Sequence, residues 1–110
     1  MRLLQKELLL DECFPLWQKA MTPEVLAADF DIRGGSWRVV DGWLIGEHRD
    51  NSPGMVISRE DFFGDVLLEF RANTILPCTH DINAMWSGSW NYETNTRDVA
   101  YVGGLQGWWH

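Results

Sequence analysis

The chain has few cysteines, few basic residues and no long apolar segment. Its two cysteines, Cys13 and Cys78, are too few for a disulfide framework and lack the paired spacing of a zinc site. A single bridge between them is one alternative, and two free, buried thiols are the arrangement that we expect. Polar residues at positions 5–7 interrupt the apolar start, so the sequence predicts neither a cleavable signal peptide nor a membrane span.

Basic residues are the scarcer charge. Nine Lys and Arg stand against 16 Asp and Glu, which gives a formal net charge of −7. Neutralising phosphates requires a basic surface, so this balance argues against nucleic acid as a partner. An anionic membrane surface is disfavoured for the same reason. We therefore expect a ligand that is neutral or weakly charged. Because the sequence predicts neither a signal peptide nor a membrane span, we expect a cytoplasmic protein.

Hydrophobic residues, by contrast, are plentiful. They make up 45% of the 110 residues and include seven tryptophans, which is enough material for a packed core. The length predicts a single domain over residues 1–110. Because the chain ends on an apolar Trp108-Trp109 pair, we expect one of two arrangements. Either the domain is truncated at its C-terminal end, or a homo-oligomer covers residues 99–110.

The strongest local signal is Asp41-Gly42, which separates two short runs rich in β-branched and aromatic residues. This dipeptide predicts a type I′ turn, in which both central residues need a positive φ. A two-residue turn would place Val40 opposite Trp43 and Val39 opposite Leu44. The sequence therefore predicts a β-hairpin over residues 37–46.

Other segments carry weaker signals. A threonine followed by a proline at positions 22–23 predicts a short helix over residues 23–28. Residues 3–12 fit a helix or a buried outer strand. Gly103-Gly104 indicates a break after the last strand. The remaining strands are predicted over residues 54–58, 65–71, 81–86 and 99–102. Three tryptophans are expected in the core: Trp37, Trp43 and Trp86.

The motif W-x-V-x-D-G-x-L at residues 37–44, followed by F-G-D-V-L-L-E-F-R at residues 63–71, resembles the 3-keto-disaccharide hydrolase family. The D-I-N-A segment at residues 81–84 is similar to a strand of lectin-like proteins from bacterial rhamnogalacturonan-degradation clusters. The resemblance covers roughly residues 37–86. It implies an all-β fold, an antiparallel jelly-roll sandwich of the concanavalin A-like lectin/glucanase type, of which this chain would be only part.

The same resemblance implies a carbohydrate-active protein, a glycoside hydrolase or lyase-like enzyme that acts on a glycosidic bond of an oligosaccharide. A non-catalytic carbohydrate-binding module is the alternative, and a structural subunit without a site of its own is the third. A glycosidase needs two carboxylates across the scissile bond. Our candidates for the acid and base are Glu69 and Asp81. A structural role is the alternative for each. For Glu69 it is an ion pair with Arg71 or with a neighbouring strand, and for Asp81 it is a solvated or loop-capping position.

Sugar binding needs aromatic faces for the C–H groups and polar groups for the hydroxyls. Arg71 and Asn83 are candidates for the polar contacts. Trp90 and Tyr92, which stand among Asn, Ser and Thr, are candidates for stacking on the sugar. His48 and His80 have no spacing that supports a metal site, so we expect neither metal nor cofactor.

Overall fold

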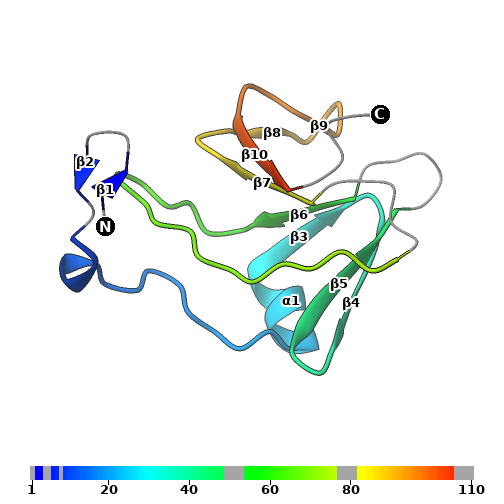
Figure 1. The fold of residues 1–110 in the computed structure, drawn as a ribbon. Coiled ribbons are helices and arrows are strands. Elements are labelled where there is room, and N and C mark those ends of the chain that lie inside the picture. Colours follow the sequence, from blue (N-terminus) through cyan, green and yellow to red (C-terminus); the bar gives the residue numbers. More distant parts are fainter. Residues whose placement is uncertain (1, 4–5, 8, 49–53, 77–81, 106–110) are drawn as a thin grey trace. The chain divides into compact units, whose positions relative to one another are not determined.

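The computed structural model describes the chain except for residues 1, 4–5, 8, 49–53, 77–81 and 106–110. The chain divides into two compact units, residues 1–66 and residues 67–110. Both units consist mainly of short antiparallel strands with little helix (Figure 1), and every described sheet has two strands. The described part of the chain is therefore β-rich, as the sequence predicts.

The described part of the first unit contains three antiparallel ladders and one α-helix, α1 (Pro23–Asp29). Strand β1 (Arg2–Leu3) pairs with β2 (Lys6–Glu7). Strand β3 (Phe30–Arg33) pairs with β6 (Met55–Ser58), and β4 (Ser36–Val40) pairs with β5 (Trp43–Glu47). A 3₁₀ turn, η1 (Leu10–Glu12), follows the first ladder, so the described part of the ambiguous N-terminal segment is a short antiparallel pair and a turn.

The predicted hairpin is confirmed as β4–β5. Val40 is opposite Trp43 and Val39 is opposite Leu44, which is the register expected for a two-residue turn. Asp41 has a φ of 49° and Gly42 a φ of 79°. Positive φ at both central positions is the signature of the type I′ turn, whose twist matches that of the flanking strands.

The predicted helix is confirmed as α1, one residue longer than expected. The hydroxyl of Thr22 accepts a hydrogen bond from the backbone N–H of Val25 at 3.2 Å, and Pro23 occupies the first turn. This cap satisfies one of the N–H groups that a helix start leaves open. Leu26, at 7% exposure, is the one buried hydrophobic side chain among the described residues, and α1 contacts β3 and β4.

Trp37 connects two of the ladders in the first unit. Its indole N–H donates to the carbonyl of Gly34 at 3.0 Å. A Cβ added at Gly46, directly across the hairpin, would lie 2.6 Å from the Trp37 ring, and one at Gly54 would lie 3.2 Å from it. The ring thus covers both glycines, one on β5 and the other just before β6. Trp37 is half-buried, which falls short of the core position that the sequence predicts.

The second unit contains two ladders. Strand β7 (Ile82–Trp86) pairs with β10 (Tyr101–Leu105), and β8 (Trp90–Asn91) pairs with β9 (Thr96–Arg97). The strand predicted over residues 81–86 is therefore present from Ile82 onward. The last strand is also present, but it runs through Gly103 and Gly104, where the sequence predicted a break. Both glycines are paired, with Ala84 and Asn83 respectively, because neighbouring β7 supplies ladder partners.

The prediction of a strand over residues 65–71 is wrong. These residues form neither helix nor strand, and the structure has no backbone–backbone hydrogen bond between them and any described residue. Alternating apolar and polar residues favour one buried face, but a strand also needs a neighbour to pair with. Here Val66, Leu68 and Phe70 remain 50–60% exposed.

Three burial expectations also need correction. Trp43 and Trp86 are each 51% exposed, since two-stranded ladders offer no opposing layer to cover their faces. Cys13 is a free thiol but an exposed one, because it follows the short η1 turn in an open segment. Cys78 lies outside the described residues.

The packing of Trp37 leads to a stability prediction for Gly46→Ala. The added methyl would overlap the Trp37 ring, so we expect a loss of about 1–3 kcal/mol in the free energy of unfolding. In a Trp37→Leu background the same change should be neutral or slightly stabilising, because alanine restricts the unfolded chain more than glycine. Urea unfolding of the wild type, of Gly46→Ala, of Trp37→Leu and of the double variant measures the coupling free energy between positions 37 and 46.

Gly42→Ala is the matched control in the same hairpin. Open space surrounds Gly42, so the alanine meets no neighbouring atoms. The loss in the free energy of unfolding on Gly42→Ala then comes only from the positive φ, is about 1 kcal/mol, and should not depend on Trp37. Equal costs of Gly46→Ala with and without Trp37 would show that the ring does not set this glycine requirement.

Candidate functional site

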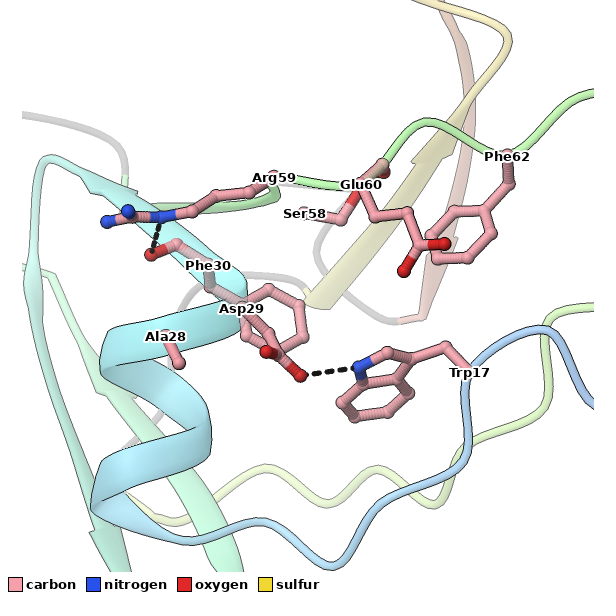
Figure 2. Close-up of a pocket in the computed structure, with 8 residues that line it drawn as sticks. All are labelled: Trp17, Ala28, Asp29, Phe30, Ser58, Arg59, Glu60 and Phe62. Atoms are coloured by element: carbon pink, nitrogen blue, oxygen red, sulfur yellow. Dashed lines mark hydrogen bonds between the residues drawn. The ribbon is translucent and has the colours of Figure 1, made fainter.

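The first unit holds a cavity of about 330 Å³ between the segment before α1, the α1–β3 junction and the segment after β6. Figure 2 shows the side chains of these three segments around the gap. Its wall contains both aromatic and oxygen-bearing side chains. The lining residues are Trp17, Ala28, Asp29, Phe30, Ser58, Arg59, Glu60 and Phe62.

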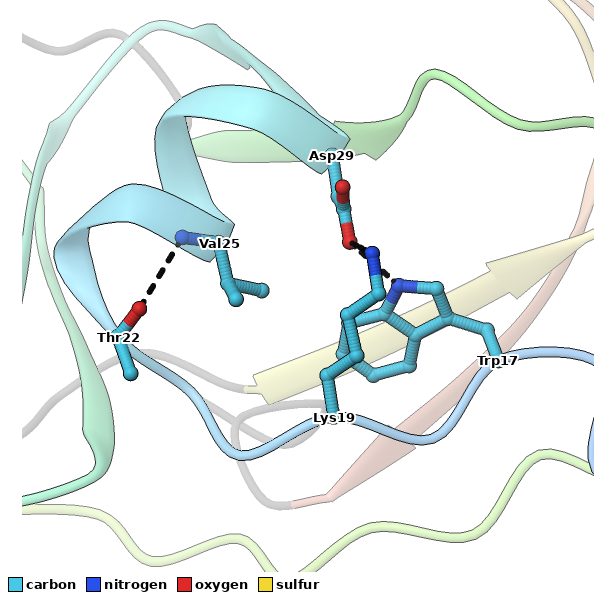
Figure 3. A network of polar contacts seen from close by, with 5 residues as sticks. All are labelled: Trp17, Lys19, Thr22, Val25 and Asp29. Atoms are coloured by element: carbon cyan, nitrogen blue, oxygen red, sulfur yellow. Dashed lines mark hydrogen bonds and ion pairs between the residues drawn. The ribbon is translucent and has the colours of Figure 1, made fainter.

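Asp29 is the most strongly held polar group of this cavity. Its Oδ2 accepts a hydrogen bond from the indole N–H of Trp17 at 2.7 Å and from the Lys19 ammonium at 2.5 Å (Figure 3). These two donors lower the pKa of Asp29, with the Lys19 hydrogen bond the larger cause. A carboxylate at the C-terminal end of a helix meets the negative end of the helix dipole, so both donors compensate for an unfavourable position.

Trp17 forms the aromatic floor of the cavity. Its ring meets the ring of Phe30 edge-on, with centroids 5.6 Å apart and planes at 80°. Such a T-shaped pair is a favoured geometry between aromatic quadrupoles. Together with the bond to Asp29, it attaches the irregular segment before α1 to the rest of the first unit.

Arg59 fixes the side of the cavity formed by β3 and β6. Its backbone N–H donates to the carbonyl of Asp29 at 2.9 Å, and its Nε donates to the carbonyl of Phe30 at 3.2 Å. The guanidinium also lies 3.0 Å from the carboxylate of Asp31. Figure 2 shows this side chain directed along β3 and away from the gap. Arg59 therefore has a structural role.

Glu60 is the group left open to a ligand. Among the described residues, the structure contains no hydrogen bond or ion pair to its carboxylate, which Figure 2 shows turned toward the Phe62 ring. The neighbouring Ser58 hydroxyl donates to the backbone carbonyl of Glu60 at 3.0 Å. Carboxylate and hydroxyl oxygens beside aromatic rings can bind hydroxyl groups and stack against C–H faces.

The sequence-predicted polar residues lie in the second unit. Glu69 and Arg71 are both exposed in the segment without regular structure, and no ion pair joins them, so the structural alternative for Glu69 is not seen. Asn83 is exposed on β7, opposite Gly104. Asp81 lies outside the described residues, so the acid–base pair proposed with Glu69 stays a prediction.

A shallow depression of about 380 Å³ brings two of these regions together. Phe70, which separates Glu69 from Arg71, lines it, together with Gly104, the partner of Asn83. The remaining lining residues are Ala72, Ile82 and Gly103. Its wall is thus apolar, and the candidate polar side chains are its sequence neighbours rather than its lining.

The two predicted stacking residues belong to one hairpin. Trp90 on β8 is half-buried, and its indole N–H is buried without a hydrogen-bond partner among the described residues. Tyr92 stands in the following turn at 53% exposure. The side-chain oxygen of Asn91 accepts the backbone N–H groups of Glu93 and Thr94, both at 3.0 Å, which closes this turn.

Sequence reasoning did not find the cavity of the first unit. Its residues come from three segments separated by 10 to 30 positions, and β3, which brings two of those segments together, has no clear strand signal before the structure is known. Within the described ranges there is also no cluster of His, Cys, Asp and Glu that could hold a metal ion. No helix there is long and apolar enough to cross a membrane.

The contacts of Asp29 lead to a prediction for the pH dependence of stability. Its folded-state pKa lies below the usual 3.8, so the unfolded chain binds the proton more readily. The ionised group therefore stabilises the fold above about pH 4, and this contribution is lost as the pH falls through the folded-state pKa. Urea midpoints measured between pH 3 and pH 7 follow this loss.

Asp29→Asn should lower the midpoint at pH 7 and flatten its decline in acid. Asp61→Asn, which removes an exposed carboxyl close to the same cavity, serves as the control and should leave the decline unchanged. If the urea midpoints of the wild type and of Asp29→Asn decline in parallel as the pH falls, Asp29 is not the source of the pH-dependent stability.

Comparison of the chain with protein-family models, with curated proteins and with solved structures gives no match.

Proposed function

We propose that this protein binds a neutral carbohydrate in the cavity of the first unit. The observation that carries the proposal is the lining: the Trp17 ring and the Phe62 ring border the same gap as the open carboxylate of Glu60. A sugar ring presents apolar C–H faces and hydroxyl donors, so it matches aromatic rings and carboxylate oxygens at once. The volume of about 330 Å³ lies at the lower end of the range for small-molecule sites, which suits one or two sugar rings.

Charge favours an uncharged sugar. Asp29 and Glu60 both line the cavity, and the chain carries a net charge of −7. An anionic uronate would approach like charges at close range, whereas hydroxyl groups gain charge-assisted hydrogen bonds from the same carboxylates. Neutral oligosaccharides should therefore bind better than oligosaccharides of similar length that contain uronate.

Glycosidic-bond hydrolysis is the second candidate function, and one specific observation favours it. Two carboxylates in different environments line one cavity: Asp29 has a lowered pKa, and Glu60 has no partner among the described residues. Glycosidases divide acid and base roles between two such groups. In this form of the proposal, Asp29 and Glu60 would be the two carboxylates of the site, in place of the Glu69 and Asp81 pair expected from the sequence.

The jelly-roll architecture belongs to the same proposal. Its support is the hairpin over residues 37–46 and the antiparallel strand at Ile82–Trp86, which carry two of the three motifs of the resemblance. The third motif, at residues 63–71, forms no strand. In a complete sandwich, further strands would cover the faces that Trp43 and Trp86 leave exposed.

Titration with a panel of neutral and uronate-containing oligosaccharides, followed by calorimetry and NMR, tests binding. Trp17→Ala should weaken it at least about tenfold, because the stacking surface is lost. Trp43→Ala removes an equally large ring from the β4–β5 hairpin and should leave the affinity unchanged. If affinity instead falls on Trp90→Ala or Tyr92→Ala, the sugar binds the β8–β9 hairpin and the cavity is the wrong site.

Release of reducing ends from the sugars that bind tests hydrolysis. Glu60→Gln should abolish turnover and keep binding within about threefold, since the amide retains an oxygen acceptor. Glu69→Gln is the matched control on an exposed carboxylate. Loss of turnover on Glu69→Gln alone would restore the sequence-based assignment, and binding without any turnover would leave the protein a carbohydrate-binding module.

A further inference from the structure

Residues 65–71, Asp-Val-Leu-Leu-Glu-Phe-Arg, have a strand pattern in the sequence and no strand partner among the described residues. No backbone–backbone hydrogen bond joins them to another described residue. Four of their side chains are large and apolar, and all four remain about half exposed: Val66, Leu67, Leu68 and Phe70. A segment whose backbone N–H and C=O groups have no partner among the described residues can pair with a strand of another chain.

The order of charges in this segment identifies the partner. In an antiparallel pair of two copies centred on Leu68, Asp65 of each copy is opposite Arg71 of the other. Val66 is then opposite Phe70, Leu67 is opposite Glu69, and Leu68 is opposite itself. Opposite charges and paired apolar residues are the cross-strand combinations that stabilise antiparallel ladders.

Other arrangements of the same two segments bring like charges together. Parallel pairing in register would set Asp65, Glu69 and Arg71 against their own copies. An antiparallel pair centred on Leu67 would oppose Asp65 and Glu69, and one centred on Glu69 would oppose the two Glu69 carboxylates. Since like charges directly opposite are destabilising, these registers are disfavoured. Centring on Phe70 pairs Glu69 with Arg71 but leaves Asp65 opposite Ile75.

We propose that residues 65–71 form a self-complementary antiparallel strand pair with a second copy of this chain, centred on Leu68. The interface is isologous, because the same residues serve both copies across a two-fold axis. One face of the pair collects Val66, Leu68 and Phe70 from each copy, and the other carries two Asp65–Arg71 ion pairs. Seven residues per copy bury a small area, so the dimer is weak and depends on concentration.

Charge reversal tests both the partner and the register. Asp65→Arg alone places two arginines opposite each other at both ends of the pair, and Arg71→Asp alone does the same with two aspartates. Each single variant should raise the dimer dissociation constant, measured by sedimentation equilibrium, about tenfold or more. Asp61→Arg, the same change at an exposed residue outside the segment, should leave it unchanged.

Mixing the two single variants tests the register more directly. Asp65→Arg and Arg71→Asp chains together restore both attractive pairs, so the mixture should form a heterodimer with an affinity within about threefold of the wild type. The double variant Asp65→Arg/Arg71→Asp should likewise recover self-association. These residues are exposed, and far-UV circular dichroism of each variant verifies that the fold is kept.

Three results would overturn the proposal. The first is a wild-type chain that stays monomeric at the highest concentration reached. The second is a dimer that Asp65→Arg weakens no more than Asp61→Arg does, which would place the contact elsewhere, for example at residues 99–110. The third is a dimer that Glu69→Arg weakens and Asp65→Arg does not, because that result assigns the centre of the pair to Phe70 instead of Leu68.

Discussion

The first unit depends on the packing of the Trp37 indole across Gly46 and Gly54. A two-stranded ladder has little stability by itself, because each strand has only one neighbour and one partly covered face. The hydrogen bonds of the β4–β5 hairpin connect only its own two strands. Trp37 adds an apolar contact from this hairpin to the start of β6, and β6 pairs with β3. The glycines allow the ring to approach the backbone, and the bond from its N–H to the Gly34 carbonyl fixes its orientation.

Burial elsewhere is slight, and this shapes how the molecule can function. Leu26 is the one buried hydrophobic side chain in the described ranges, while tryptophans and leucines in both units remain half exposed. Exposed aromatic groups such as the stacked Trp86–Tyr101 pair, with centroids 6.0 Å apart, are surfaces on which a sugar or another protein chain can settle. A carbohydrate-binding role and self-association through a strand edge both use this exposed apolar area.

Local signals in the sequence were sufficient where one short segment determines its own geometry. Asp41-Gly42 specifies its turn, Thr22-Pro23 specifies the helix start, and the strands ending at Ser58 and Trp86 follow from β-branched and apolar runs. The pairing of β3 with β6 depends on a contact between distant segments, and the β8–β9 hairpin depends on the Asn91 side chain rather than on hydrophobic alternation. The same limit explains the error at residues 65–71, where the pattern is strand-like but the described part of the chain provides no strand to pair with. It also explains why the cavity around Asp29 was missed, since that cavity exists only after three segments come together.

Arg59 has a consequence for the alignment of the β3–β6 ladder. Four residue pairs could in principle shift by two positions and keep the same faces buried, since side chains alternate with a period of two. Directly after β6, however, Arg59 contacts three consecutive residues: the carbonyl of Asp29, the carbonyl of Phe30 and the carboxylate of Asp31. Any sliding of the strands would break all three contacts together, so a single side chain and its backbone N–H act as a stop that selects one alignment during folding.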